Sequence, residues 1–390
     1  MQEKKQIRKL ISDSLLEVAD AIESGQYKEK VRIGITTLGS EHGIENLVKG
    51  AELAARNNKD IQVVLLGPKV DTKLEVVEVN SEEELHKTME KLLDEKYIQA
   101  CVTNHYNFPI GVSTVGRVVT PGLGNEMFIA TTTGTSSTHR GEAMMKNALY
   151  GIITAKCMGV SNPTVGVLNL DGARQVERAL KELASNGYPI QFAESMRADG
   201  GSVMRGNDLL CGSADVMVMD TLTGNILMKV FSSYTTGGSY EAMGYGYGPG
   251  VGENFERIIL IISRASGVPV VANAISYAAS LARGGLADIG REELKKAKAA
   301  GLEKILQSLS KDSQKTNETS VNVLMPDKEV VTGQISGIEI MDLEDAVKSL
   351  WQAGIYAESG MGCTGPIVLV NDTRVEKAAA VLGKAGFITQ

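Results

Sequence analysis

The sequence is poor in cysteine and histidine, and this scarcity excludes several kinds of site. Only four residues of each type occur among 390. The cysteines lie far apart and form no Cys-x-x-Cys pair, so they predict neither a disulfide framework nor a zinc site and fit a reducing compartment. We therefore expect no bound metal and no cofactor beyond a co-substrate. The four cysteines are Cys101, Cys157, Cys211 and Cys363.

The sequence also lacks a surplus of positive charge and any long apolar run. Its net charge is -7, and no cluster of Lys and Arg is interleaved with aromatic residues, which argues against a nucleic-acid surface. Nowhere do about 18 apolar residues follow one another, and the first ten residues are charged rather than apolar. We expect no membrane span, no signal peptide and a cytoplasmic location. With 43% hydrophobic residues, the chain can bury a large core.

Short apolar runs alternate with helical patterns along most of the chain. Continuous apolar strands between helices are typical of a parallel sheet covered on both faces. We therefore predict a three-layer α/β/α sandwich with a mainly parallel sheet, which binds its ligand at the carboxyl ends of the strands. The predicted strands are residues 31–36, 61–66, 74–79, 100–102, 127–130, 164–170, 190–193, 215–219 and 268–272. The predicted helices are residues 3–24, 43–57, 81 onward, 141–158, 173–186, 223–234, 253–265 and 290–309.

A polar stretch at residues 311–320 contains no apolar side chain and predicts a linker. We place a domain boundary there, with the sandwich at residues 1–309, the linker at 310–320 and a small α/β domain at 321–390. Within the small domain, the sequence predicts strands at residues 321–324, 329–332 and 367–370, a helix at 343–353 and a last helix near residue 376.

The first candidate ligand loop, residues 36–43, joins a predicted strand to a predicted helix. Its sequence is Thr-Thr-Leu-Gly-Ser-Glu-His-Gly, and its N–H groups and hydroxyls would attract an anion. Ser40 and His42 are candidate ligands. The loop lacks the P-loop lysine and the spacing of a dinucleotide fingerprint. A plain capped turn explains it equally well, and His42 alone is more typical of a local hydrogen bond than of a catalyst.

The second candidate loop, residues 220–225, follows the predicted strand at 215–219 and opens a helix. A helix N-terminus contributes about 0.3–1 kcal/mol to binding of an exposed anion, whereas millimolar binding needs about 4 kcal/mol. Other groups must therefore contribute, or the loop is only a helix cap. The candidates are Thr221, Thr223, Gly224, Asn225 and Lys229.

Residues 237–252 are unusually rich in glycine and include Tyr245 and Tyr247. We interpret this stretch as a mobile lid or an acyl-group channel, with a surface loop as the alternative. A dehydrogenase is disfavoured, because the glycines do not follow a strand as a dinucleotide site requires.

Cys363 lies in a Gly-rich stretch, residues 359–366, ahead of the apolar run at 367–370. We expect a loop at the mouth of a strand, where the amides of Gly362 and Gly365 could stabilise a thiolate or an oxyanion. Our hypothesis is a nucleophilic cysteine that carries an acyl group; a small packed side chain in a tight turn is the alternative. Cys101 is a possible second thiol, although a core cysteine is the more typical interpretation of its apolar segment.

Three segments, residues 33–43, 163–169 and above all 215–229, resemble the phosphate acyltransferases of phospholipid synthesis. Those enzymes make acyl phosphate from an acyl carrier thioester and inorganic phosphate, on an α/β/α fold related to phosphotransacetylase. The resemblance implies that fold and that reaction for residues 30–300. The chain departs from the family at residues 39–42, where Gly-Ser-Glu-His stands in place of Gly-Gly-Asp-His.

The extension beyond the acyltransferase region, and its Gly-Met-Gly-Cys-Thr-Gly-Pro segment at residues 360–366, are similar to the alpha subunits of protein C in glycine, sarcosine and betaine reductase complexes. In that family a carboxymethyl group is carried as a selenoether on selenoprotein A, and an acetyl thioester is cleaved by phosphate to acetyl phosphate. The resemblance implies that Cys363 carries the acetyl group. It also implies a ketoacyl-synthase-like beta subunit as partner, within a homo-oligomer or hetero-oligomer.

Two alternatives stay open at this point. A lipid-type phosphate acyltransferase would need a long apolar channel and no Cys363. A catalytically silent docking subunit would bury Cys363 in an unreactive place.

Overall fold

The computed structural model describes residues 30–197, 200–315, 325–338, 342–362 and 365–388, and the separate residues 12, 15, 16, 18, 19 and 22. Residue contacts divide the chain into two compact units. The first unit comprises residues 1–106, 232–249 and 256–286; the second comprises residues 107–231, 250–255 and 287–390. The boundaries expected from the sequence, at residues 1–309, 310–320 and 321–390, remain a prediction.

The first unit contains five parallel strands in the order β3-β2-β1-β4-β12. The chain runs outward from β1 through β2 to β3, and α3 then carries it back to β4 on the other side of β1. Because crossovers between parallel strands are right-handed, α2 and α3 cover opposite faces. The elements are β1 (Val31–Thr36), α2 (Ile44–Asn57), β2 (Ile61–Gly67), β3 (Glu75–Glu78), α3 (Glu82–Asp94), β4 (Ala100–Thr103), β12 (Ile259–Ile261) and α8 (Val268–Gly284).

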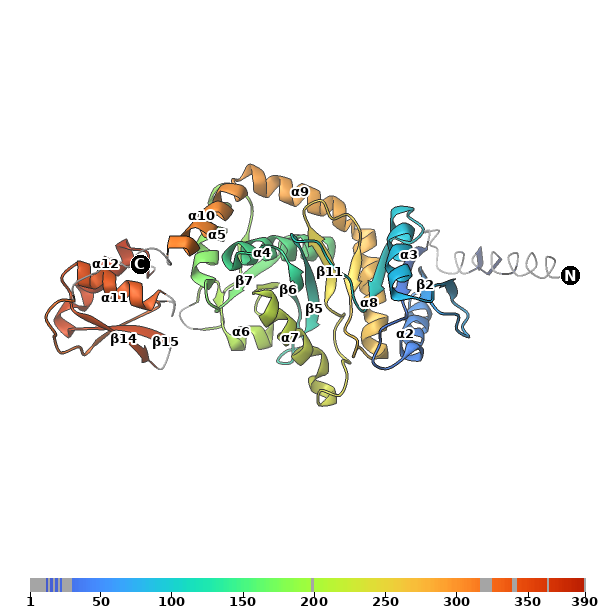
Figure 1. Cartoon of the computed structure of the whole chain (residues 1–390), viewed down its shortest axis with the longest axis horizontal. Helices are drawn as coiled ribbons and strands as arrows, with labels where there is room; N and C mark the ends of the chain where they lie inside the picture. The colour runs from blue at the N-terminus through green and yellow to red at the C-terminus, as the bar shows by residue number, and fades with distance from the viewer. Residues whose placement is uncertain are drawn as a thin grey trace. The chain divides into compact units, whose positions relative to one another are not determined.

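The second unit contains strands in the order β5-β6-β10-β7-β8, with β9 also beside β7. Within this order, the pairs are parallel except β5 with β6. Figure 1 shows α4 and α5 on one side of these strands and α6 and α7 on the other. The elements are β5 (Val112–Val119), β6 (Glu126–Thr135), α4 (Arg140–Cys157), β7 (Thr164–Leu168), α5 (Ala173–Ser185), β8 (Gln191–Phe192), β9 (Val203–Met204), α6 (Gly206–Cys211), β10 (Val216–Val218), α7 (Thr221–Ser233), α9 (Leu286–Ala299) and α10 (Leu302–Lys315).

The C-terminal part of the second unit has an antiparallel sheet of its own, in the order β13-β15-β14. One apolar core lies between this sheet and two helices. It includes Leu350 of α11, Leu382 of α12 and Val368 of β15. The elements are β13 (Gly333–Ser336), α11 (Leu343–Gln352), β14 (Ala357–Gly362), β15 (Gly365–Val370) and α12 (Val375–Lys384), with a short 3-10 turn at Asp372–Arg374.

The mainly parallel α/β architecture predicted from the sequence is confirmed, and so is the start of α3 at its capping serine. The Ser81 side chain accepts a hydrogen bond from the Glu84 N–H at 3.3 Å. The first residues of the predicted linker are helical, because α10 continues to Lys315. The helix predicted at residues 290–309 is in fact two helices, since α9 ends at Ala299 and α10 begins at Leu302. The strand predicted at 321–324 lies outside the described residues.

Two neighbouring elements were assigned wrongly from the sequence. Residues 268–272 were expected as a strand, but they form the first turn and a half of α8, with a proline in that turn. A short apolar run fits a buried helix as well as a strand, and here Val270 and Val271 are fully buried. The helix expected at residues 253–265 is instead a loop leading into β12.

The glycine-rich stretch at residues 237–252 is not a loop throughout. Its last five residues form β11 (Gly248–Gly252), whose first residues pair with β12 in the first unit and whose last residues pair with β5 in the second. Gly250 has no room for a side chain, because a Cβ atom there would lie 2.3 Å from the Phe108 ring. Tyr247 is buried, and its hydroxyl donates to the Glu241 carboxylate at 3.0 Å.

Candidate functional sites

The loop after β1 begins at the carboxyl end of that strand, in the first unit. Its Ser40 hydroxyl accepts a hydrogen bond from the His42 N–H at 3.2 Å, and His42 Nε2 lies 3.3 Å from the Ala265 carbonyl oxygen. The following helix α2 begins at Ile44, and its N-cap residue Gly43 has no side chain to cap it. Its first N–H groups are therefore left without a side-chain acceptor.

The strand next to β1 ends beside this loop. The Asn104 side chain, just after β4, donates to the Leu38 carbonyl oxygen at 2.8 Å. The Thr36 hydroxyl donates to that of Thr103 at 2.9 Å. Since the chain leaves β1 toward β2 and returns to β4 on its other side, β1 and β4 flank the point where the strand order reverses. That is the place where open parallel sheets bind ligands.

A third segment of the first unit meets the same loop. The carbonyl oxygen of Arg264, just after β12, accepts a hydrogen bond from the Glu41 N–H at 2.9 Å. The Asn46 side chain donates to the Ser266 carbonyl oxygen at 2.9 Å. The Arg264 side chain is exposed, and its guanidinium makes no ion pair with any residue that the structure describes. The backbone of Arg264 thus lies against the loop that precedes α2.

The loop after β10, in the second unit, is arranged differently. Asp220 caps α7, since its carboxylate accepts from the Thr223 N–H at 2.9 Å and from the Thr223 hydroxyl at 3.0 Å. The Asn225 amide donates to the Thr132 carbonyl oxygen at 3.0 Å, and the Thr221 hydroxyl to that of Gly134 at 3.3 Å. These bonds fasten the start of α7 to the end of β6.

Helix α7 packs closely against β6 at Gly224. A Cβ atom on Gly224 would lie 1.7 Å from the Thr131 carbonyl oxygen, so no other residue fits without a shift of backbone. Lys229 is exposed and lies two helical turns further on, about 12 Å from Thr221 along the axis. The structure therefore brings the predicted residues of this loop together, except that Lys229 lies apart from them.

Arg140 joins the loop after β10 to the end of β7. Its guanidinium pairs with Asp171 at 3.0 Å and with Asp220 at 2.9 Å. Burial alone would raise the pKa of Asp220, but the bonds from Thr223 and the charge of Arg140 outweigh burial and lower that pKa below its usual value. Asp220 is thus a stable anion placed where the helix N-terminus would otherwise attract one.

The predicted nucleophile, Cys363, lies outside the described residues together with Thr364. The flanking residues do not form the predicted loop: residues 357–362 and 365–370 are the two antiparallel strands β14 and β15. Gly362 is opposite Gly365 at the end of the pairing. On both sides of the undescribed pair the chain is therefore strand rather than loop, a pattern that the glycines concealed in the sequence.

The remaining cysteines are placed as core or near-core residues. Cys101 is fully buried in β4, and burial raises the pKa of its thiol well above the usual range. Burial also raises the pKa of Cys157 to about 12. Cys211 is half-buried. The core interpretation of Cys101 fits this placement better than a second acyl-carrying thiol, because a neutral buried thiol is a poor nucleophile.

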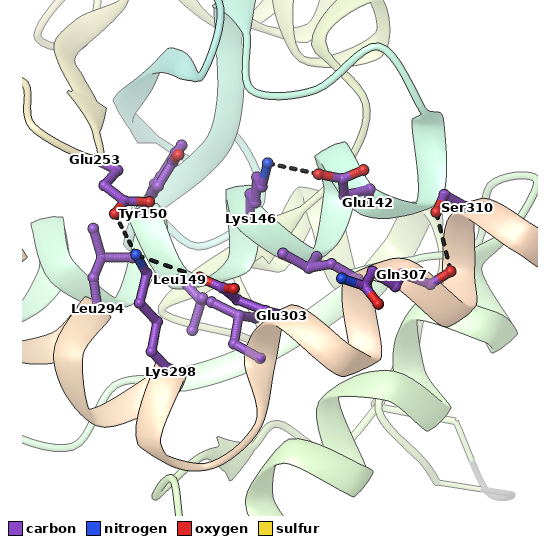
Figure 2. A pocket seen from close by; sticks show the side chains of 12 residues that line it. Glu142, Lys146, Leu149, Tyr150, Glu253, Leu294, Lys298, Glu303, Gln307 and Ser310 are labelled. Atoms are coloured by element: carbon purple, nitrogen blue, oxygen red, sulfur yellow. Dashed lines mark hydrogen bonds and ion pairs between the residues drawn. The ribbon is translucent and has the colours of Figure 1, made fainter.

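A cavity of about 270 Å³ lies in the second unit between α4, α9 and α10 (Figure 2). Its charged side chains pair with one another: Lys146 with Glu142 at 2.6 Å, and Lys298 with Glu303 at 3.6 Å and with Glu253. None of the site residues predicted from the sequence lines it. Among the described residues, no group of three His, Cys, Asp or Glu side chains could hold a metal ion, and no helix is long and apolar enough to span a membrane.

Comparison with known proteins agrees with the resemblance seen in the sequence. The model of the family described as "Fatty acid synthesis protein" matches residues 31–369. The glycine/sarcosine/betaine reductase complex component C subunit alpha of Peptoclostridium acidaminophilum is 70% identical over 382 residues, which cover 98% of this chain and 99% of that one. The chain belongs to the family of these component C alpha subunits.

Members of this family are distantly related to phosphate acyltransferases. The phosphate acyltransferase of Geobacillus thermodenitrificans (strain NG80-2) is 24% identical over 236 residues, covering 51% of this component C chain and 70% of the enzyme. Among solved structures, 4-hydroxythreonine-4-phosphate dehydrogenase from Klebsiella pneumoniae overlaps with a TM-score of 0.43 and 11% identity, covering 65% of this chain and 100% of its own.

Sequence reasoning missed three polar residues that surround the two loops. Arg264 lies in a segment assigned wholly to a helix, which concealed its place after a strand. Asn104 and Asp220 each directly follow an apolar strand in the sequence. A polar residue at that position is a usable signal, because parallel strands present their carboxyl ends on one edge of the sheet.

Proposed function

We propose that this chain is the acetyl-phosphate-forming subunit of a glycine reductase component C. The observation that carries the proposal is the 70% identity, over nearly the whole of both chains, to a component C alpha subunit. The relationship to phosphate acyltransferases adds a reaction type, the transfer of an acyl group from a thioester to phosphate.

The transfer step needs one nucleophile and one leaving group. An acetyl group is held as a thioester on Cys363. An oxygen of hydrogenphosphate attacks the carbonyl carbon, a tetrahedral intermediate forms, and the carbon–sulfur bond breaks with its electron pair left on sulfur. The products are acetyl phosphate and the Cys363 thiolate, and no electrons are exchanged with an outside group. The phosphate dianion is itself the nucleophile, so the step requires no general base.

The glycines beside Cys363 suit this step. The tetrahedral oxyanion needs fixed donors, and we assign that role to backbone N–H groups around Gly362 and Gly365. A free thiol is only a few per cent thiolate at neutral pH, so the same donors would favour the thiolate as well. Phosphate would be held by one of the two strand-end loops, that with Ser40 and His42 or that with Thr221, Thr223 and Asn225.

The partners follow from the same relationship. We infer that the acetyl group is derived from a carboxymethyl selenoether on a carrier selenoprotein A, and that a ketoacyl-synthase-like beta subunit acts with this chain. No cofactor other than phosphate as co-substrate is proposed.

The function is tested by running the transfer backwards. Purified chain is incubated with acetyl phosphate, and its peptides are examined by mass spectrometry, with Cys363→Ser and Cys101→Ser as matched variants. We expect a hydroxylamine-labile acetyl group on the Cys363 peptide, absent in Cys363→Ser and unchanged in Cys101→Ser. Acetyl phosphate hydrolysis or exchange without any acetylated thiol would favour direct transfer, as in a lipid-type acyltransferase. No reaction of any kind would favour a docking subunit.

A further inference from the structure

The first N–H groups of α2 have no side-chain acceptor at the N-cap position. Its N-cap residue Gly43 offers no side-chain acceptor, and the positive end of the helix dipole is left open at the carboxyl end of β1. Arg264, whose carbonyl oxygen accepts a hydrogen bond from the Glu41 N–H in the preceding loop, has an exposed guanidinium with no ion pair among the described residues. Both features favour an anion, although neither by itself defines a ligand.

Asn104 supplies an independent sign of a ligand. Its side chain is only 9% exposed, and its Oδ1 atom is covered yet accepts no hydrogen bond from any described residue. The Nδ2 atom is fixed by its bond to the Leu38 carbonyl oxygen, which leaves Oδ1 as an acceptor in need of a donor. A buried acceptor without a partner is costly, so a donor that reaches it is strongly favoured.

Hydrogenphosphate is the anion that offers such a donor. At neutral pH it carries one O–H group as well as charged oxygens, whereas sulfate carries no proton. Resting on the proposed function, in which phosphate is a co-substrate, we propose that hydrogenphosphate binds between β1 and β4 in the first unit. Its charged oxygens face the first turn of α2 and Arg264, and its hydroxyl donates to Asn104 Oδ1. Asn104 is then the residue that selects phosphate over sulfate.

The neighbouring loop has the freedom that this binding needs. Since Asn104 Oδ1 is covered, residues 39–43 have to shift before a ligand reaches it, while Leu38 keeps its bond to Nδ2. Gly39, next to Asn104, has a φ of +87°, and Gly43 has a φ of +78°, so neither position is constrained by a side chain. Carboxylates nearby oppose the anion: Glu45 lies in the first turn of α2, and Glu82 Oε1 lies 3.9 Å from where a Cβ atom of Gly39 would be. Glu82 therefore weakens phosphate binding at this place.

The opposing charges give a paired test on the full chain. Binding of inorganic phosphate, and of sulfate, is measured by isothermal titration calorimetry. We expect Arg264→Gln to weaken phosphate binding by roughly tenfold or more, the loss of one charge-assisted hydrogen bond. We expect Glu82→Gln to tighten phosphate binding about twofold, since an exposed charge at this distance is partly screened. Arg140→Gln is the matched control in the second unit, and it should leave phosphate affinity unchanged.

Selectivity tests the role of Asn104 separately. Asn104→Ala should bring the phosphate and sulfate affinities to within about twofold of one another, because no acceptor is then left that distinguishes the protonated anion from the unprotonated one. Circular dichroism checks that this variant still folds, and Arg264→Gln and Glu82→Gln keep the proposal testable if it does not. A loss of binding in Arg140→Gln with none in Arg264→Gln, or no phosphate binding to the wild type, would overturn the proposal.

The two proposals fail in distinguishable ways. Phosphate binding that depends on Arg264, with no acetylated Cys363, would leave this site standing and reject the thioester. Acetylation of Cys363 with no effect of Arg264→Gln on phosphate binding would support the thioester and reject this phosphate site.

Discussion

The loop after β1 and the loop after β10 hold similar places in their own units, each joining the carboxyl end of a parallel strand to a helix. They differ in how far their polar groups are already bonded. In the loop after β10, Asp220 caps the helix and pairs with Arg140, and three side chains bond to backbone oxygens or to that cap. In the loop after β1, the helix has no cap and Asn104 Oδ1 has no described partner.

The difference shows that two loops of similar composition can serve structure and binding respectively. A hydroxyl or amide that already holds a backbone oxygen gains little by turning to a ligand, because one hydrogen bond is exchanged for another. An anion already at a helix N-terminus also repels a second one. The loop with unused groups is therefore the better binding site.

The largest expected effect separates the two loops by their glycines. Gly224→Ala should lower the free energy of unfolding by about 3 kcal/mol, since the new methyl group would meet the Thr131 carbonyl oxygen. Gly43→Ala meets no atom within 4 Å and should cost only about 1 kcal/mol, the strain of a left-handed backbone. Denaturant unfolding measures both. Equal losses of unfolding free energy in the two variants would show that α7 does not pack closely against β6.

The next effect concerns the cap of α7. Asp220→Ala should lower the free energy of unfolding by about 1 kcal/mol, because it removes the acceptor of the Thr223 N–H. Ser40→Ala, at the comparable place in the first unit, serves as the matched variant. A cost for Asp220→Ala no larger than that of Ser40→Ala would contradict the structural role given to the loop after β10.

A pH series sharpens the same contrast. The pKa of Asp220 is lower in the folded chain than its usual value of 3.8, so the folded state favours the carboxylate. This stabilisation is complete above the usual pKa and is lost as the pH falls through the folded value. The stability gap between wild type and Asp220→Asn should therefore be constant near neutrality and shrink below about pH 4. A stability difference between wild type and Asp220→Asn that grows at acidic pH would show that the ionised Asp220 carboxylate is not its cause.

The smallest effect is expected at Ser40. Its hydroxyl accepts one exposed hydrogen bond from the His42 N–H at 3.2 Å, so Ser40→Ala should cost less than about 0.5 kcal/mol in unfolding free energy. The same unfolding experiment measures it. A cost above 1 kcal/mol would mean that the loop after β1 is fastened as firmly as its counterpart, and would remove the contrast between them.

The sequence predicted the alternation of strands and helices because buried parallel strands are continuous apolar runs. It misassigned residues 268–272, since the same apolar run begins a helix that is buried on most sides. It identified both strand-end loops, yet it did not distinguish them. Which polar side chains are already bonded depends on neighbours that are distant in the chain. Thr132 is the partner of Asn225, and Arg140 is the partner of Asp220, and no local sequence pattern predicts these contacts.

The most direct test of the account is isotope exchange between labelled inorganic phosphate and acetyl phosphate, catalysed by the purified chain. A thioester on Cys363 that phosphate cleaves reversibly predicts exchange in the wild type, none in Cys363→Ser, full exchange in Cys101→Ser and a large loss in Arg264→Gln. Exchange that persists in Cys363→Ser, or its absence from the wild-type chain, would contradict the thioester mechanism.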